Sequence, residues 1–187
     1  RLKMATLSVT NIFNFSKATL VKFGALDWIA DAVADAIANS ESVGNRICGL
    51  YYLESYCLQL KSGRVRGDIE PIVSQEKAGI VRVDAKFGFA QPAFQRGIVP
   101  AREAALKNGI CSLAIGHAHT CTSLGYFTEQ IAKSNLIGIG FTNASPIVAA
   151  PGGKSRIIGT NPIAFSVPDG KGNTVIHFDQ STTAVAL

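Results

Sequence analysis

Apolar residues recur at helical spacing through residues 8 to 43, and this pattern constrains the fold more than any other feature of the chain. The spacing divides near Gly24, which predicts two helices joined by a short turn. Beyond residue 62, short apolar runs typical of strands alternate with helical segments. We therefore predict a helical N-terminal region over residues 4–75, followed by a mixed α/β domain over residues 76–187.

Composition excludes several classes of protein. The chain has 187 residues, of which 47% are hydrophobic and 17% charged, so it can bury a core and is not disordered. No apolar run approaches the roughly 18 residues of a membrane span, and the N-terminus lacks the pattern of a secretory signal. We expect a cytoplasmic protein whose natural start is Met4. The four cysteines form no C-x-x-C pair, which argues against a disulfide framework and a zinc ribbon.

The net charge of +5 raises the question of nucleic-acid binding. The densest basic cluster, Lys61, Arg64 and Arg66, is short and has no aromatic residues placed for base stacking. We expect no nucleic-acid partner. A basic surface equally suits an anionic small molecule, whether a carboxylate or the phosphates of a cofactor.

The remaining elements follow from local patterns. A third helix is expected over residues 49–61, a connection over 67–75, a strand over 80–83 and a helix over 92–108 that Pro100 should kink or divide. A buried strand over 110–115, a helix over 123–134, a strand over 136–141 and a hairpin of 163–167 with 174–178 follow. The chain stops at Leu187 without a polar tail, and we expect a truncated chain.

The densest polar chemistry is the run from His117 through His119 to Cys121. Alternate residues of an extended segment share a face, so two imidazoles and a thiolate could converge on a metal ion. Two other interpretations stay open: loop histidines with hydrogen-bond partners beside a packed cysteine, or a catalytic role for one histidine. His177 stands alone in a predicted strand and is expected to be structural.

Two turns, residues 141–146 and 159–162, combine hydroxyl and amide side chains with residues that tolerate unusual backbone angles. Such turns can hold ribose, amide or phosphate groups, although ordinary turn chemistry explains them equally well. Asp179 follows a strand and is either a ligand-binding carboxylate or a helix cap. No G-x-G-x-x-G or phosphate-binding loop is present, so a Rossmann site is not supported.

These landmarks together resemble the malate/L-lactate dehydrogenase family that lacks a Rossmann fold. The resemblance runs through Leu60-Lys61-Ser62-Gly63, Gly88-Phe89-Ala90-Gln91, Phe141-Thr142-Asn143-Ala144-Ser145-Pro146, Pro151-Gly152-Gly153-Lys154, Gly159-Thr160-Asn161-Pro162 and Asp179-Gln180-Ser181-Thr182-Thr183. It implies a mixed, largely antiparallel sheet with flanking helices, here incomplete, because chains of this family are much longer. It also implies NAD or NADP as cofactor and hydride transfer at the C2 carbon of a 2-hydroxy, 2-oxo or 2-imino acid.

The resemblance also implies site residues. The positions that match the family's cofactor-binding motifs are Thr142, Asn143, Ala144, Thr160, Asn161, Asp179, Gln180 and Ser181. Cys48 occupies the place of the family's first functional histidine, and Thr120 aligns with the second, whereas His119 lies one residue earlier. We take Cys48, His119 and Thr120 as the candidate catalytic residues, because reduction of an oxo acid needs a nearby proton donor. A cyclic imino acid whose imine nitrogen is already protonated needs a proton donor less than a 2-oxo acid does.

We therefore expect an NAD(P)-dependent oxidoreductase that acts on a small 2-hydroxy, 2-oxo or cyclic 2-imino acid, as a homodimer without a membrane partner. Two alternatives remain. The first is a catalytically silent or truncated relative, since both family histidines are replaced. The second is a metal-dependent hydrolase that uses His117, His119 and Cys121.

Overall fold

The computed structural model describes residues 6–183, so the predicted start at Met4 lies outside the described residues. The chain divides into two compact units, one up to Thr122 and one from Ser123 onward. The boundary predicted between residues 75 and 76 falls inside a strand, Ile72–Lys77, whereas the last of the N-terminal helices ends at Lys61. Within the described residues, no helix combines the length and apolar character that crossing a bilayer requires.

The first unit begins with helices, as the periodicity predicts. They are α1 (Val9–Lys22), α2 (Asp27–Ser42), the short 3-10 turns η1 (Arg46–Cys48) and η2 (Leu50–Tyr52), and α3 (Leu53–Lys61). The Ser8 hydroxyl accepts the Asn11 amide at 3.1 Å and starts α1. Asp27 is the first residue of α2 and makes no capping bond at that end, so the cap that its position suggests does not form. The helices bury one apolar cluster that includes Leu20, Ile29, Val33, Ile37, Tyr56 and Phe89.

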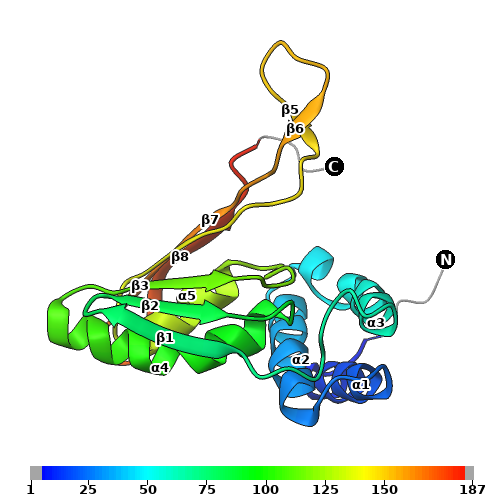
Figure 1. Cartoon of the computed structure of the whole chain (residues 1–187), viewed down its shortest axis with the longest axis horizontal. Coiled ribbons are helices and arrows are strands. Elements are labelled where there is room, and N and C mark those ends of the chain that lie inside the picture. Colours follow the sequence, from blue (N-terminus) through cyan, green and yellow to red (C-terminus); the bar gives the residue numbers. More distant parts are fainter. Residues whose placement is uncertain (1–5, 184–187) are drawn as a thin grey trace. The chain divides into compact units, whose positions relative to one another are not determined.

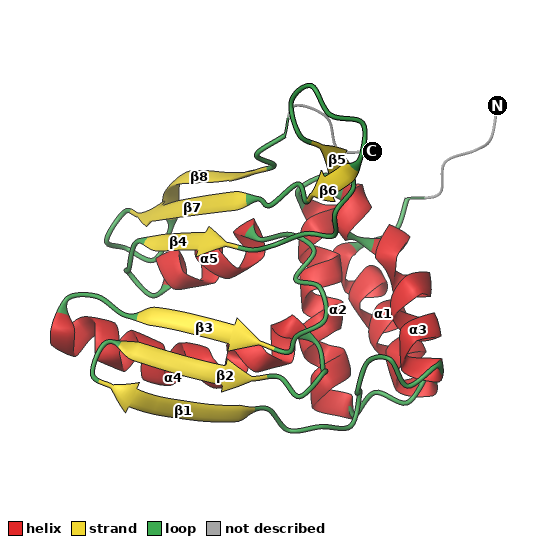
Figure 2. Cartoon of the chain, turned by 45° about the horizontal axis from the view of Figure 1, so that its top comes forward, coloured by secondary structure: helices red, strands yellow, loops and turns green. Residues whose placement is uncertain are grey.

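A three-stranded sheet follows in the same unit. Strand β2 (Ile80–Asp84) pairs antiparallel with β1 (Ile72–Lys77) and parallel with β3 (Ser112–Gly116). Helix α4 (Ala90–Asn108) connects β2 to β3 and packs on one face of the sheet (Figure 2). It ends at Gly109, whose φ of 82° is the left-handed conformation that glycine adopts readily.

Helix α4 continues unbroken through Pro100, so of the two expected effects of this proline, a kink or a division, the division does not occur. Proline removes one backbone hydrogen bond, but the helix is held by its packing. Gly97 lies so close to the sheet that a Cβ atom there would come within 2.6 Å of a Val83 methyl carbon. Ala93, Ala101 and Ala104 on this helix are also buried.

The second unit is a strand-rich body with one helix. Helix α5 (Gly125–Lys133) packs on a sheet in the order β4 (Gly138–Phe141), β7 (Ile163–Pro168), β8 (Thr174–Gln180), and all pairs are antiparallel. The hairpin of β7 and β8 is confirmed. Between β4 and β7 the chain extends to a small two-stranded sheet of β5 (Val148–Ala149) and β6 (Arg156–Ile158) (Figure 1). The expected α/β architecture with mostly antiparallel pairing is therefore present.

The close approach of α5 to β4 depends on glycine. A Cβ atom on Gly138 would lie 2.8 Å from the Thr128 carbonyl oxygen, which is backbone and cannot rotate away. We expect Gly138→Ala to lower the free energy of unfolding by about 1–3 kcal/mol, because it forces the helix away from the sheet. Urea unfolding followed by circular dichroism measures this. Gly116→Ala is the matched control, since a Cβ there meets nothing within 4 Å; equal effects of the two substitutions would contradict the packing argument.

Candidate functional site

The loop that carries His119 is fixed by backbone hydrogen bonds to the start of α4. The His119 amide donates to the Gly88 carbonyl at 2.8 Å, and its carbonyl accepts the Ala90 amide at 3.1 Å. These bonds form an isolated parallel bridge between Phe89 and His119. The imidazole therefore has a defined backbone anchor, although it lies in a loop.

Three rings meet around this anchor. Tyr56 from α3, Phe89 and His119 pack edge-on against one another, with centroid separations of 5.4 Å for Tyr56 and Phe89, 6.0 Å for Tyr56 and His119, and 5.9 Å for Phe89 and His119. Tyr56 and Phe89 are each 1% exposed. These edge-to-face contacts hold the imidazole in one orientation, because their energy depends on the angle between the rings.

Several polar atoms in this part of the fold are buried without a partner. Among the described residues, the Tyr56 hydroxyl, Gln91 Oε1 and His119 Nε2 make no hydrogen bond of acceptable geometry. Gln91 is 1% exposed, and its Nε2 atom donates to the Cys121 carbonyl at 3.3 Å. Buried polar groups in folded proteins are nearly always paired, so orphaned ones indicate a place where a ligand or an ordered water binds.

Burial also sets the ionisation of the two polar rings. It lowers the pKa of His119 below 6.5, and the Arg64 guanidinium lowers it further, so the imidazole is neutral at pH 7. Burial raises the pKa of Tyr56 far above its usual range, although the nearby Thr122 hydroxyl opposes this rise. At neutral pH the cluster thus presents an uncharged imidazole and a protonated phenol, which can accept and donate protons.

The structure brings two of the predicted catalytic residues to Tyr56. His119 contacts its ring, and the Cys48 thiol lies close enough that a thiolate there would raise the pKa of Tyr56 still further. Cys48 is the last residue of η1, so it does not lie at the N-terminus of a helix, where the helix dipole would lower the pKa of a thiol. The Thr120 hydroxyl accepts the Thr122 amide at 3.2 Å and shapes the loop.

Sequence reasoning missed Tyr56. Its signal is its position in α3, where Leu53, Cys57 and Leu60 form the buried face. A tyrosine on such a face brings a hydroxyl that must find a partner. That requirement could have marked it as a candidate.

The metal-site alternative finds no support. The His117 Nδ1 atom lies 3.0 Å from Asp84 Oδ1, and its ring packs on Phe87 at 5.3 Å, whereas His119 packs on Tyr56. Within residues 6–183, no three His, Cys, Asp or Glu side chains are grouped to hold a metal ion.

In the second unit, the two predicted turns lie against each other. The Asn161 side-chain oxygen accepts the Ala144 amide at 2.9 Å, and the Thr142 amide donates to the Pro162 carbonyl at 3.4 Å. Asn161 has a φ of 33°, and a Cβ on Gly159 would lie 2.2 Å from the Ala144 carbonyl oxygen. Glycine and asparagine are thus required here for close approach and left-handed backbone.

The segment after β8 joins this pair of turns. The Thr160 carbonyl accepts the Thr182 amide at 3.0 Å and also the hydroxyls of Ser181 and Thr182. The candidate residues of the Asn143 turn, the Asn161 turn and the Ser181 segment are therefore brought together.

Asp179 lies within β8, and the structure describes no helix after it, so it does not cap a following helix as one interpretation expected; it bonds the start of α5 instead. Its Oδ2 atom accepts the Gly125 amide at 2.7 Å and the Ser123 hydroxyl at 3.2 Å, at the start of α5. Its other carboxylate oxygen is not used in these two bonds. Gln180 is exposed at the end of β8.

This donor set fits a nicotinamide dinucleotide. Hydroxyls of Thr142 and Ser181, the Asn143 carboxamide and the Asp179 carboxylate can bond ribose hydroxyls and amide groups. The orphaned atoms of Tyr56 and His119 in the first unit suit the polar groups of a small acid.

Comparisons with known proteins agree with this chemistry. The family model described as malate/L-lactate dehydrogenase matches residues 7–187. The chain is 35% identical over 181 residues to the (2R)-3-sulfolactate dehydrogenase (NADP(+)) of Chromohalobacter salexigens, covering 96% of this chain and 54% of that protein. It is 32% identical over 181 residues to the Delta(1)-pyrroline-2-carboxylate/Delta(1)-piperideine-2-carboxylate reductase of Pseudomonas syringae pv. tomato, covering 97% and 52%.

Solved structures give the same result. The delta1-piperideine-2-carboxylate reductase of Pseudomonas syringae superposes with a TM-score of 0.91 at 32% identity, covering 98% of this chain and 55% of that one. The malate dehydrogenase of Pyrococcus horikoshii OT3 superposes with a TM-score of 0.90 at 29% identity, covering 97% and 51%. The chain thus spans about half the length of the curated relatives it matches. From the motifs, the fold and these matches together, we conclude that the chain belongs to the malate/L-lactate dehydrogenase family.

Proposed function

We propose that the protein is an NAD(P)-dependent oxidoreductase that interconverts a small 2-hydroxy acid and its 2-oxo acid, or reduces a cyclic 2-imino acid. The observation that supports this most is the cluster of Tyr56, Phe89 and His119, in which the hydroxyl and Nε2 are buried without partners. Two relatives, one named as a sulfolactate dehydrogenase and one as a pyrroline-2-carboxylate reductase, support the substrate class.

The proposed division of labour follows from the chemistry of each group. Bound NAD(P)H supplies the hydride for the C2 carbon of the substrate. His119 Nε2 accepts the hydroxyl proton during oxidation, because its lowered pKa leaves it neutral at pH 7. The Tyr56 hydroxyl donates a hydrogen bond to the substrate oxygen or nitrogen, and the turns around Asn143, Asn161 and Ser181 hold the cofactor together with Asp179.

A titration with NADH and NADPH tests this function. The nucleotide fluorescence is measured on the 187-residue chain and on the full-length protein. Micromolar binding by the full-length protein supports the proposal and justifies a screen of 2-oxo and cyclic imino acids. Absence of binding by both would overturn it.

Cys48 offers a competing proton donor, because it stands where the family has a histidine. If His119 is the donor, Cys48→Ala should lower turnover less than about tenfold, since one lining contact is lost. If Cys48 is the donor, the loss should be about 10²-fold or more. Steady-state turnover of the full-length enzyme distinguishes the two, with Cys111→Ala as a control in another part of the unit.

We further propose that the protein works in the cytoplasm as a homodimer. Exposed apolar side chains on the N-terminal helices support the homodimer, since Phe15 is 59% and Val9 49% exposed. Sedimentation equilibrium of the full-length protein checks the oligomeric state; a monomer at micromolar concentration would contradict it.

A further inference from the structure

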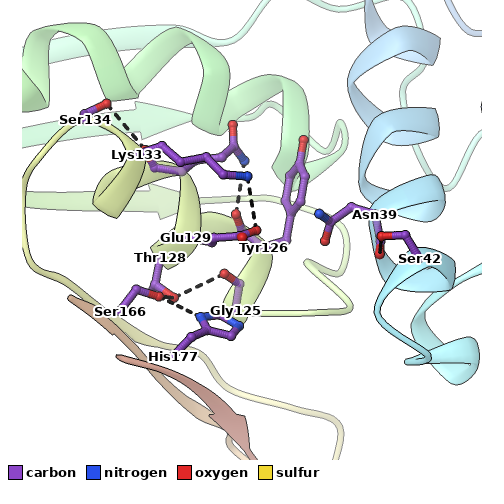
Figure 3. Close-up of polar contacts among 11 residues, drawn as sticks. Asn39, Ser42, Gly125, Tyr126, Thr128, Glu129, Lys133, Ser134, Ser166 and His177 are labelled. Atoms are coloured by element: carbon purple, nitrogen blue, oxygen red, sulfur yellow. Dashed lines mark hydrogen bonds and ion pairs between the residues drawn. The ribbon is translucent and has the colours of Figure 1, made fainter. Parts of the chain in front are cut away.

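His177, expected to be an isolated structural residue, begins a chain of hydrogen bonds that lies wholly within the second unit (Figure 3). It pairs across the strands with Ser166, and its Nδ1 atom lies 2.8 Å from the Ser166 hydroxyl. The Ser166 hydroxyl lies 2.9 Å from that of Thr128, and Thr128 Oγ1 lies 3.2 Å from the Gly125 carbonyl oxygen. Ser166 is 0% and Thr128 1% exposed, so water does not compete for the central bonds.

The direction of every proton in this relay is determined. A carbonyl oxygen only accepts, so Thr128 must donate to Gly125. The Thr128 oxygen then accepts from Ser166, whose only proton is used in that bond. His177 Nδ1 must therefore carry a proton and donate to the Ser166 hydroxyl.

The relay ends on a residue that Asp179 also holds. The Gly125 amide donates to Asp179 Oδ2 at 2.7 Å, while the Gly125 carbonyl accepts the relay. A Cβ atom on Gly125 would lie 2.8 Å from His177 Cε1 and 2.9 Å from Asp179 Cβ. The His177 ring and the Asp179 side chain thus both lie close to Gly125, the residue that receives the relay at its carbonyl and binds Asp179 through its amide.

We propose that His177 and Ser166 are positioning residues for Asp179, a role that rests on the proposed function of Asp179 as a cofactor contact. His177 acts through its Nδ1 proton and does not itself touch the cofactor. The relay, whose central residues Ser166 and Thr128 are buried, holds the first turn of α5. This turn holds Asp179 Oδ2, so that the other carboxylate oxygen is presented in one orientation. Orienting groups of this kind contribute to ligand affinity without contacting the ligand.

Substitutions at His177 separate this role from direct contact. The asparagine amide nitrogen occupies the place of Nδ1, and the glutamine amide nitrogen occupies the place of Nε2. We expect His177→Asn to keep the dissociation constant of the full-length protein for NADPH or NADH within about twofold. His177→Gln and Ser166→Ala should each weaken it by roughly tenfold, the lower end of losses seen when an orienting partner is removed. Val175→Ala, on the same face of β8, is the control and should leave the affinity unchanged.

A second measurement does not need the cofactor. Nitrogen chemical shifts of the His177 ring should report the Nδ1–H tautomer, and hydrogen exchange at the Gly125 amide should accelerate in Ser166→Ala and His177→Gln but not in His177→Asn. An Nε2–H tautomer, or unchanged Gly125 exchange in all variants, would overturn the relay.

The binding results distinguish the possible failures. If the full-length protein binds no dinucleotide, the proposed function is refuted. The tautomer of His177 and the exchange of the Gly125 amide then still test whether the relay exists. In a protein that does bind, unaltered affinity of Ser166→Ala and His177→Gln would overturn the positioning role. Retained affinity in His177→Gln together with weakened affinity in His177→Asn would also overturn it, because the hydrogen bond that matters would then be made by Nε2.

Discussion

His119→Asn should lower the turnover of the full-length enzyme by about 10²–10⁴-fold, the usual contribution of a positioned acid or base. Asparagine keeps a polar side chain in the ring cluster but cannot take up or release a proton at pH 7. Steady-state kinetics with the substrate found in the acid screen measures the effect. His117→Asn is the matched control, since His117 is exposed on Asp84 and its φ of 48° suits asparagine. Equal losses in both variants would remove His119 from its proposed role.

The same residue predicts a pH dependence with a definite sign. Because burial lowers the pKa of His119 below 6.5, oxidation by the neutral base should be fully active at pH 7 and decline as the pH falls through that lowered pKa. Reduction, which uses the protonated ring, should change in the opposite direction. A pH profile of kcat/KM measures both directions, and a profile that is unaltered in His119→Asn would contradict the assignment.

Tyr56→Phe should raise the free energy of unfolding by about 1 kcal/mol while it lowers turnover by about 10²-fold. The hydroxyl is buried and makes no well-formed hydrogen bond among the described residues, since the nearby Thr122 hydroxyl donates its proton to the Cys121 carbonyl, so removal of the Tyr56 hydroxyl abolishes a desolvation cost. The same removal deletes a donor that we propose for the substrate, and single donors of this kind contribute two to three orders of magnitude to turnover.

Urea unfolding and steady-state turnover of the same preparation measure these opposite effects. Tyr51→Phe is the control, because Tyr51 is 77% exposed and its hydroxyl is solvated. A loss of stability in Tyr56→Phe would mean that the hydroxyl has a strong partner, such as an ordered water, in the free enzyme.

Elements with a clear local pattern could be predicted. The helices on either side of Gly24 follow from apolar spacing, and the β7–β8 hairpin follows from two apolar runs around a polar turn. Strand β1 was assigned largely to a connection, because all six of its residues are exposed and Pro71 precedes it. The strand over residues 110–115 was expected to be buried, but β3 begins at Ser112, and Ile110 is 76% exposed.

The site was less accessible to sequence reasoning than the fold. His119 and the turns around Asn143 and Asn161 stand out by residue type, and the resemblance to a family assigned each of them to a catalytic or a cofactor-binding position. The contact of Tyr56 with His119 joins residues 63 positions apart, so no local pattern contains it. The bond of Asp179 to Gly125 is likewise tertiary, and this is why its role as cap or ligand stayed open.

The mixed pairing of strand β2 has a consequence for the order of folding. Its antiparallel neighbour β1 closes through a tight turn, whereas its parallel neighbour β3 can join only after the chain has passed through all of α4. Closing a long loop costs more chain entropy than closing a hairpin, so the β2–β3 pairing is expected to form later. The loop that carries His119 follows β3 directly. The cluster of Tyr56, Phe89 and His119 should therefore be among the last features of its unit to assemble, and substitutions that weaken α4 should delay it more than they delay the β1–β2 hairpin.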